Sequence, residues 1–245
     1  MEKKYDLTSI CNNNTSNLPS DEVYKSFNDF IFSDDIRVTG KLLHRFKHFL
    51  DTKHLPGDIV EVGVFKGSGV ATFTKFIDIF CPNSNKKVIG FDIFDVEQGK
   101  LVLNEKDSEI DKNTMTVVYD KVDKSELSIK AVNDRLANVS KNIASRVKLI
   151  EGDVEDTMPK FLKENPGFRA SLIYIDVDIA RPTYIAMKYL WDRLLPGGVI
   201  LFDEYEYHVF SESDGVDMFL EETGVKYNLL STDWVGPTAY LKKSL

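Results

Sequence analysis

The sequence predicts an α/β protein with a doubly wound, mainly parallel sheet of seven strands and an N-terminal helical extension. From Asp58 onward, short apolar runs alternate with segments whose apolar residues recur at helical spacing. Such alternation is typical of a parallel sheet covered by helices on both faces. The last two apolar runs have no helix between them, so we expect them to form an antiparallel pair.

The expected strands are short runs rich in β-branched and aromatic residues. They span 58–64, 87–94, 146–152, 170–178, 197–205, 225–231 and 238–243. Helices are expected at 68–80, 157–164, 182–194 and 214–223. A further helix should start at Ser125 as its N-cap, with one apolar face made of Ile129, Val132, Leu136, Val139 and Ile143.

The segments outside this alternation suggest a division of the chain into 1–56 and 57–245. Residues 1–20 are polar and predict a loose arm, and helices follow near 21–32 and 34–54. We expect 1–56 to supply lid or oligomer contacts and 57–245 to form one domain. The charged, weakly periodic stretch 95–124 is either a solvated surface excursion or an insertion that covers the substrate.

Composition excludes several classes of protein. The net charge of −8 argues against a nucleic-acid-binding surface. No apolar run approaches the roughly 18 residues of a membrane span, and the N-terminus lacks the apolar core of a signal peptide. Two cysteines, Cys11 and Cys81, are too few for a disulfide framework. We therefore expect a cytoplasmic protein without a membrane or nucleic-acid partner.

The junction of the first strand and the next helix reads Glu61-Val-Gly63-Val-Phe-Lys-Gly67-Ser68-Gly. A dinucleotide fingerprint would need glycine at 63, 65 and 68, and a P-loop would need a Gly-Lys-Ser/Thr that is absent. The spacing Glu-x-Gly-x-x-x-Gly instead resembles the first motif of S-adenosylmethionine enzymes, in which this loop holds the amino-acid end of the cofactor. The alternative is that the glycines only turn a strand into a helix.

Two further acids follow strands where this cofactor needs them. Asp92 closes the second strand, where a carboxylate can accept hydrogen bonds from both ribose hydroxyls. Asp153 follows the third strand, where a carboxylate can accept from the adenine amino group. Together with the glycine loop, these positions predict S-adenosylmethionine as the cofactor.

Four carboxylates follow two strands that should be neighbours: Asp176, Asp178, Asp203 and Glu204. Neighbouring strands lie about 4.8 Å apart, and two like charges about 4 Å apart repel by roughly 4 kcal/mol at an effective dielectric of 20. The cluster thus needs a cation, protonation or a basic partner. Hard oxygen ligands suit Mg²⁺, with Mn²⁺ or Ca²⁺ as alternatives. The other interpretations are that these acids cap helices and face water, or that Arg181 or Lys188 neutralises them.

The segment 174–205, YIDVDIARPTYIAMKYLWDRLLPGGVILFDEY, resembles the signature of the macrocin O-methyltransferase family, a group of class I methyltransferases with a Rossmann-like fold. The family comprises metal-dependent enzymes that methylate sugar hydroxyls. By this resemblance Asp176, Asp203 and Glu204 bind the metal, and Asp178 is the general base. Two positions depart from the family pattern: Glu204 replaces an Asp, and Ala180 replaces a Tyr.

The expected function is metal-dependent O-methylation of a small, sugar-like hydroxylated acceptor. By resemblance, and because the apolar N-terminal helices need a surface to cover, we expect a homo-oligomer, a dimer in its simplest form. His208 is a candidate second base or substrate contact, against a surface or packing role. His44 and His48 are spaced to bind a metal, but without a Glu-x-x-His context we expect them, with His54, on a solvated helix face. The alternatives are a metal-independent N-methyltransferase, a non-catalytic cofactor-binding module and a nicotinamide-dependent oxidoreductase.

Overall fold

The computed structural model describes residues 20–94, 96–97, 100–101 and 104–244. Cys11 and all but the last residue of the predicted loose arm, 1–20, lie outside these residues. The main sheet comprises β1 (Asp58–Val62), β2 (Val88–Asp92), β5 (Val147–Glu151), β6 (Ala170–Ile175), β7 (Leu194–Phe202), β8 (Leu229–Ser231) and β9 (Ala239–Lys242).

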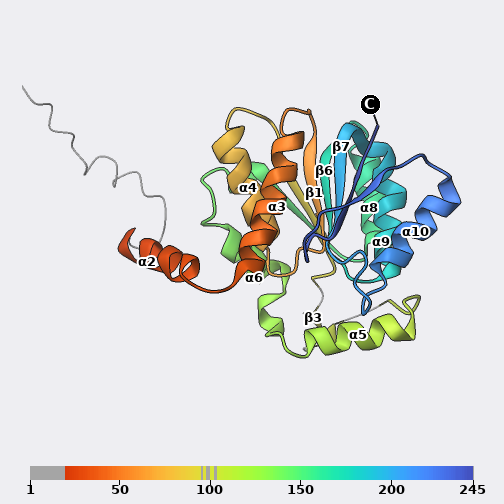
Figure 1. Cartoon of the computed structure of the whole chain (residues 1–245), viewed down its shortest axis with the longest axis horizontal. Coiled ribbons are helices and arrows are strands. Elements are labelled where there is room, and N and C mark those ends of the chain that lie inside the picture. Colours follow the sequence, from red (N-terminus) through yellow and green to blue (C-terminus); the bar gives the residue numbers. More distant parts are fainter. Residues whose placement is uncertain (1–19, 95, 98–99, 102–103, 245) are drawn as a thin grey trace, which may run out of the picture.

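The sheet has the strand order β5-β2-β1-β6-β7-β9-β8 (Figure 1). The five strands from β5 to β7 are parallel, β9 is antiparallel to β7, and β8 is antiparallel to β9. The predicted fold class is therefore confirmed, including the antiparallel pair. Because β6 and β7 are neighbours, the acidic motifs that follow them, Asp176 with Asp178 and Asp203 with Glu204, lie at the same edge of the sheet.

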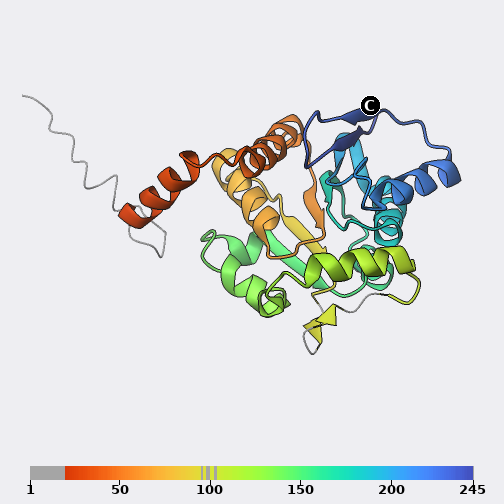
Figure 2. The ribbon, with the colours of Figure 1, turned by 60° about the horizontal axis from the view of Figure 1, so that its bottom comes forward.

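Helices cover both faces of the sheet. One face packs against α3 (Ile36–Thr52), α4 (Ser68–Phe80) and α6 (Ile129–Leu136), and the other against α8 (Val154–Glu164), α9 (Ala180–Leu190) and α10 (Glu212–Thr223). Side chains alternate between the two cores along each strand, so Ile59 joins the first and Val60 the second. Helix α2 (Ser20–Ile31) projects from this body (Figure 2). No helix of the described residues is long and apolar enough to cross a membrane.

The predicted helix from Ser125 is wrong in its start and its length. Ser125 lies in a 3₁₀ turn (Lys124–Glu126), and the side chain of Ser128 caps α6 by accepting from the N–H of Ala131. The helix ends at Leu136, and a separate short helix, α7 (Ile143–Arg146), follows. Asn138 and Ser140, poor helix formers, lie in the break, where the hydroxyl of Ser140 bonds to Asp78.

The stretch 95–124 contains a helix that the sequence analysis did not predict. Helix α5 (Glu109–Tyr119) begins at the N-cap Ser108, and a small hairpin of β3 (Val96–Glu97) and β4 (Lys100–Leu101) precedes it. The helix runs below the edge where the parallel strands end (Figures 1 and 2). This position matches an insertion that covers a site rather than a solvated excursion.

Helix α3 also differs from the expectation. His48 is 1% exposed and packs on the ring of Tyr240 at 4.6 Å, and His44 stacks on Trp234 at 6.0 Å. The expected solvated face is therefore wrong for both histidines, because the returning strand β9 and the turn before it cover this part of the helix. Burial lowers the pKa of His48 to about 4, so this side chain is neutral at pH 7.

Candidate active site

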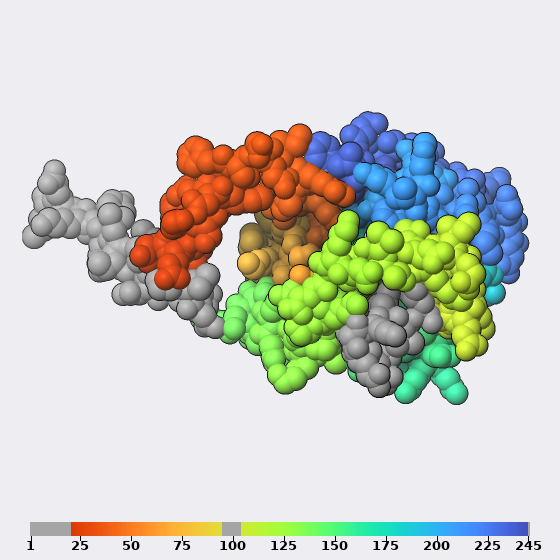
Figure 3. Space-filling view, turned by 90° about the horizontal axis from the view of Figure 1, so that it is seen from below, coloured from red at the N-terminus to blue at the C-terminus, as the bar shows by residue number. Residues whose placement is uncertain are grey.

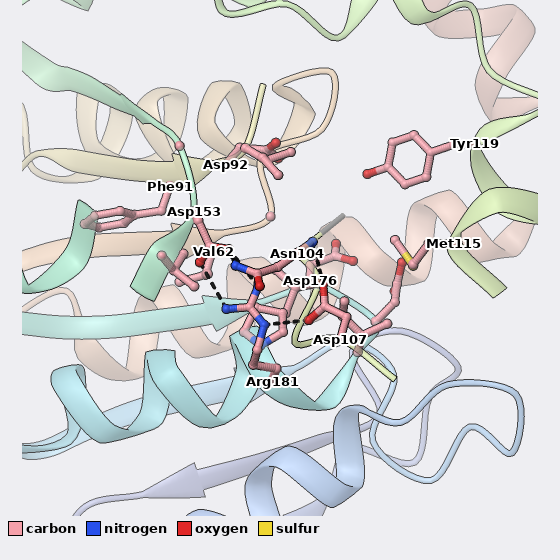
Figure 4. Close-up of a pocket in the computed structure, with 18 residues that line it drawn as sticks. Val62, Phe91, Asp92, Asn104, Asp107, Met115, Tyr119, Asp153, Asp176 and Arg181 are labelled. Atoms are coloured by element: carbon pink, nitrogen blue, oxygen red, sulfur yellow. Dashed lines mark hydrogen bonds and ion pairs between the residues drawn. The ribbon is translucent and has the colours of Figure 1, made fainter. Parts of the chain in front are cut away.

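Two cavities meet where the parallel strands end. The first is shown in Figure 4. The ends of β1, β2 and β6, the loops after β5 and β6, and helix α5 form its wall. Its polar lining consists of Asp92, Asn104, Asp107, Tyr119, Asp153, Asp176, Asp178 and Arg181.

The second cavity lies between the N-terminal helices and the insertion. Figure 3 shows it as a hollow between the orange-red helices α2 and α3 and the light-green segment. Arg37, Lys41 and Arg45 on α3 line one wall, and Tyr119 lines the opposite one. Phe210 after β7 also contributes. Residues of the N-terminal helices, of α5 and of the segment after β7 therefore all reach this cavity.

Four residues line both cavities: Gly63, Tyr119, Asp176 and Asp178. The first cavity holds the predicted ribose and adenine acids, whereas Glu61 and Ser68 line the second. A ligand placed along Asp92 would thus extend toward Gly63 and meet an acceptor beside Asp178. The junction is the place where a group can pass from one ligand to another.

The glycines of the first loop have a steric requirement of their own. Gly63 has a φ of 90°, and a Cβ there would lie 1.8 Å from the carbonyl oxygen of Asp176. Gly67 has a φ of 89°, precedes α4, and would place a Cβ 2.9 Å from Val132. Gly67 lines neither cavity. It turns the chain and packs against α6, whereas Gly63 allows β1 to approach the backbone of Asp176 closely and lines both cavities.

Asp92 is held by the backbone around it. Its Oδ2 accepts from the N–H groups of Val64 and Phe65 at 2.7 and 2.8 Å, and its Oδ1 accepts from Phe94 at 3.0 Å. Burial raises the pKa of Asp92 although these hydrogen bonds favour the charged form. A carboxylate has about four acceptor positions, so about one remains for the cofactor. The arrangement supports a ribose contact through one oxygen better than contacts through both.

Asp153 is the N-cap of α8 and is engaged on both oxygens. Arg181 donates to Oδ1 and Oδ2 at 3.2 and 2.7 Å, and Asn104 donates to Oδ2 at 2.8 Å. Arg181 also donates to Asp107 at 2.6 Å, which ties the insertion to the end of β5 (Figure 4). Burial raises the pKa of Asp153, but the hydrogen bonds outweigh it and hold the pKa below its usual value. An adenine amino group would compete with these donors.

The acidic motifs of β6 and β7 meet as predicted. Ile175 pairs with Phe202, so Asp176 and Asp203 follow at the same level of the sheet. Between them lies the ammonium of Lys41, 3.0 Å from Asp176 Oδ2 and 2.7 Å from Asp203 Oδ2. The hydroxyl of Tyr174 donates to the other oxygen of Asp203. Asp178 has a φ of 65°, in the left-handed region, and lines both cavities.

The carboxylates outnumber the cations at this edge. Burial, and then the neighbouring acids, raise the pKa of Asp176 to about 6 and that of Asp178 to about 7. The same causes raise the pKa of Glu204 to about 8. Burial also raises the pKa of Glu61 to about 8, although Arg45 lies 3.6 Å away. The site therefore tends to take up protons or a further cation at neutral pH.

Glu204 and Glu212 lie below the edge of the cavity. Glu212 is fully buried, and its Oε1 accepts from the backbone N–H of Glu204 at 2.9 Å. The Oε2 atoms of both Glu204 and Glu212 are buried with no hydrogen-bond partner among the described residues. Unpaired buried oxygens are costly, and either a proton or a bound cation would satisfy the one on Glu204.

The two alternative explanations of the acidic cluster do not hold as stated. Asp203 and Glu204 are 3% and 7% exposed and do not face water. Arg181 pairs with Asp153, and Lys188 lies 3.8 Å from Glu222, so neither neutralises the cluster. The basic partners are Lys41 and Arg45. His208 is exposed after β7 and lines neither cavity.

Asp176, Asp203 and Glu204 have the oxygen donors that a divalent cation needs, but their side chains are not arranged around one. In the described residues no three acidic, histidine or cysteine side chains converge as a metal site. The donors are nevertheless hard oxygens in excess of the positive charge, Glu204 has an unpaired oxygen, and a side-chain cation already bridges Asp176 and Asp203. A divalent ion that binds the same oxygens would require Lys41 to move.

Sequence reasoning missed Lys41, Arg45 and Tyr119. The signal for the first two was present, because Arg37, Lys41 and Arg45 follow each other at intervals of four and so share one helix face. Because the charge of this face is opposite to that of the predicted acidic cluster, the face could have been placed over the cluster. Tyr119 had no comparable signal, since its helix was not recognised.

Comparison with known proteins gives the family and supports the fold. The model of the macrocin-O-methyltransferase (TylF) family matches residues 41–243. Among curated proteins, none matches the chain. A crystal structure of CalS11, a calicheamicin methyltransferase, has a TM-score of 0.69 and 23% identity over 96% of this chain and 89% of that one. The O-methyltransferase NovP has a TM-score of 0.67 and 20% identity over 83% and 79%.

An apo structure of CalS11, described as a TDP-rhamnose 3′-O-methyltransferase, is 25% identical, with a TM-score of 0.62, over 96% of this chain and 91% of that one. The structures under 25% identity support the fold. The family model spans five sixths of the chain, from α3 to β9, and includes both acidic motifs. The chain therefore belongs to the macrocin-O-methyltransferase family and is an S-adenosylmethionine-dependent O-methyltransferase.

Proposed function

We propose that this protein transfers a methyl group from S-adenosylmethionine to a hydroxyl of a small sugar-like or sugar-derived metabolite, with a divalent cation, Mg²⁺, at Asp176, Asp203 and Glu204. One observation supports this most directly. Asp178 lies at the junction of two cavities, one beside Asp92 and one beside the carboxylates of β6 and β7. A base at such a junction can reach an acceptor while the methyl donor lies on its other side.

The residues have distinct roles in this proposal. Gly63 and Ser68 would hold the amino-acid end of the cofactor, Asp92 the ribose, and the segment around Asp153 the adenine. The cofactor supplies an activated methyl group. Asp178 would accept the proton that the acceptor hydroxyl loses. With a pKa raised to about 7, this carboxyl is a stronger base than an ordinary aspartate.

The donor set supports the cation. A divalent ion would orient neighbouring hydroxyls and lower the pKa of one of them. It would also offset the acids whose charges Lys41 and Arg45 leave partly uncompensated. Asp176 and Asp203 present one oxygen each toward Lys41, and Glu204 has a free buried oxygen.

A sugar acceptor is supported by the relatives and by the cavity wall. CalS11 is described as a TDP-rhamnose 3′-O-methyltransferase, and the likeness to its apo structure covers 96% of this chain. Here Arg37, Lys41 and Phe210 line the acceptor cavity, a mixture of cationic and aromatic groups. Such a wall suits a hydroxylated ring, including one joined to a phosphate.

Product analysis tests the proposal. The purified protein is incubated with S-adenosylmethionine, Mg²⁺ and a panel of nucleotide-linked sugars, free glycosides and amines, and methylated products are identified by mass spectrometry. A methyl ether on a sugar is the expected product. Methylation of amines alone would favour an N-methyltransferase, whereas full turnover of sugars in excess EDTA would contradict the role of the cation.

The N-terminal helices support self-association. Tyr24, Phe27 and Phe32 are 70%, 58% and 86% exposed, and α2 stands away from the body (Figure 2). Large apolar groups on a projecting helix are typical of protein interfaces. Light scattering should give a mass twice the chain mass of 27.9 kDa, and Phe27→Asp should reduce the measured mass toward that of a single chain.

A further inference from the structure

Lys41 connects the N-terminal extension to the chemistry of the sheet. It lies on α3, yet its ammonium is 3.0 Å from Asp176 and 2.7 Å from Asp203, more than a hundred positions further along the chain. Of the cations in the described residues, it is the one within ion-pair distance of both acids. Two carboxylates on neighbouring strands therefore share this tethered positive charge, and Arg45 lies 3.9 Å from Asp176 alone.

The ammonium and a divalent ion cannot occupy this place together. Mg²⁺ binds carboxylate oxygens at about 2.0–2.1 Å, and the oxygens involved here already contact Nζ. An ion bound to them would lie within a few ångströms of the ammonium and be repelled by it. Binding of the ion therefore requires the Lys41 side chain to leave.

Lys41 is able to leave, whereas Arg45 is not. The Lys41 side chain is 31% exposed and lines the open acceptor cavity, which offers room for another rotamer. The Arg45 side chain is 7% exposed, its guanidinium lies 4.6 Å from the centre of the Tyr174 ring, and it faces Glu61. The two cations thus differ in what they can do. Arg45 is a permanent part of the site, and Lys41 is a removable one.

We propose that Lys41 is a built-in counter-cation that occupies the position of the divalent ion in the metal-free protein and is displaced into the acceptor cavity when the ion binds. The inference rests on the cation site of the proposed function. Lys41 keeps Asp176 and Asp203 together in the absence of metal and weakens the affinity for the metal. Its release adds a positive charge to the acceptor cavity once the site is loaded.

Metal affinity tests the exchange directly. Mg²⁺ binding by calorimetry and Mn²⁺ binding by electron paramagnetic resonance are measured on the full chain, with and without S-adenosylhomocysteine. Lys41→Met and Lys41→Gln should bind both ions at least about tenfold more tightly than the wild type, because no ammonium has to be displaced. Lys41→Arg, which keeps the charge, should show no gain. Lys130→Met is the matched control, since Lys130 forms an exposed ion pair with Asp134.

A second measurement uses the wild-type protein and does not depend on how the variants fold. Lysine acetylation followed by peptide mass spectrometry should show that saturating Mg²⁺ raises the labelling rate of Lys41 and leaves that of Lys130 unchanged. Equal or weaker metal affinity in the neutral variants, including no binding in any of the proteins, overturns the inference. So does a Lys41 labelling rate that Mg²⁺ leaves unchanged or lowers.

These readouts separate the inference from the proposed reaction. If no sugar is methylated but the neutral variants gain metal affinity, the acceptor assignment fails and the exchange at Lys41 stands. If sugars are methylated but Lys41 substitutions leave metal affinity unchanged, the reaction stands and the inference is wrong.

Discussion

Arg181 donates hydrogen bonds to both carboxylate oxygens of Asp153, at 3.2 and 2.7 Å, and a further one to Asp107 at 2.6 Å. This guanidinium joins the first turn of α9 to the end of β5 and to the insertion. Its partners line the first cavity, so the ion pairs hold one wall of the predicted cofactor site. Bidentate pairs of this kind fix geometry as well as adding energy.

We therefore expect Asp153→Asn and Arg181→Met each to weaken S-adenosylhomocysteine binding by about tenfold, because either change loosens the wall by breaking the same pair. The double variant should be little worse than either single one, which calorimetry can measure as a double-mutant cycle. Arg193→Met, at a partly exposed arginine that donates to the backbone carbonyl of Pro166, is the control. Normal affinity in Arg181→Met with a loss in Asp153→Asn would show that Asp153 acts through the adenine alone.

Tyr119 should matter through its ring rather than its hydroxyl. The ring lies edge-on to Phe65 at 6.0 Å and forms a wall of both cavities. Tyr119→Ala should lower kcat/KM by about tenfold, since the loss of an aromatic contact and of an ordered wall is worth roughly 1–2 kcal/mol. Tyr119→Phe should stay close to the wild type, as should Val117→Ala on the exposed face of α5. A large loss in Tyr119→Phe would instead assign a role to the hydroxyl.

The stability of the metal-free protein should fall as the pH rises from 6.5 to 8. Asp176, Asp178 and Glu204 have pKa values raised to about 6, 7 and 8, so the folded state binds more protons than the unfolded state in this range. Stability then decreases with pH. The lower limit of the range avoids His48, whose pKa is lowered to about 4 and makes stability rise with pH below 6.5. The upper limit avoids Lys86, whose pKa is lowered to about 8 and makes stability rise with pH above 8.

Differential scanning calorimetry in EDTA should record this decrease as a shift of a few degrees, because 1 kcal/mol changes the Tm of a domain of this size by about 2–4 °C. Mg²⁺ should reduce the slope if it binds these carboxylates. A Tm that rises over the same range would contradict the buried, proton-binding state of the cluster.

The fold was largely predictable because its signals are local. Apolar runs at strand length between helical repeats determine the alternation, and the antiparallel end follows from the short connection between 225–231 and 238–243. The ends of α6 were not predictable in the same way. Ser125 and Ser128 are both acceptable N-caps, and the structure uses the second, while Val132 and Leu136 of the helix lie next to Gly67.

The site was predictable where its residues follow strands. Asp176 and Asp203 had to meet once β6 and β7 were neighbours. Lys41 was missed because the basic helix face that it shares with Arg37 and Arg45 was not matched to the acidic cluster, and no local pattern by itself specifies how α3 lies across the sheet. The surroundings of Asp153 were missed for the same reason, since Arg181 and Asn104 come from different segments.

Mutations of Asp178 and Asp203 should have different effects, because we assign the first as the base and the second as a cation ligand. Asp178→Asn removes the proton acceptor at the junction of the cavities but leaves the contacts of Lys41 with Asp176 and Asp203 in place. It should lower kcat by about 10²–10⁴ with little change in metal or cofactor affinity. Asp203→Asn removes a charge that Lys41 and the Tyr174 hydroxyl both contact, and should weaken metal binding, so that excess Mg²⁺ partly restores turnover.

The pH profile gives an independent measure of the base. If Asp178 accepts the proton, kcat/KM should rise with pH and level off above the pKa of this carboxyl, which is raised to about 7 without metal. A bound cation should move this limb to lower pH, because a nearby positive charge favours the carboxylate. Asp178→Asn should abolish the limb, whereas His208→Gln, at an exposed position, should leave it unchanged. Loss of the limb in His208→Gln but not in Asp178→Asn would transfer the role of base to the histidine.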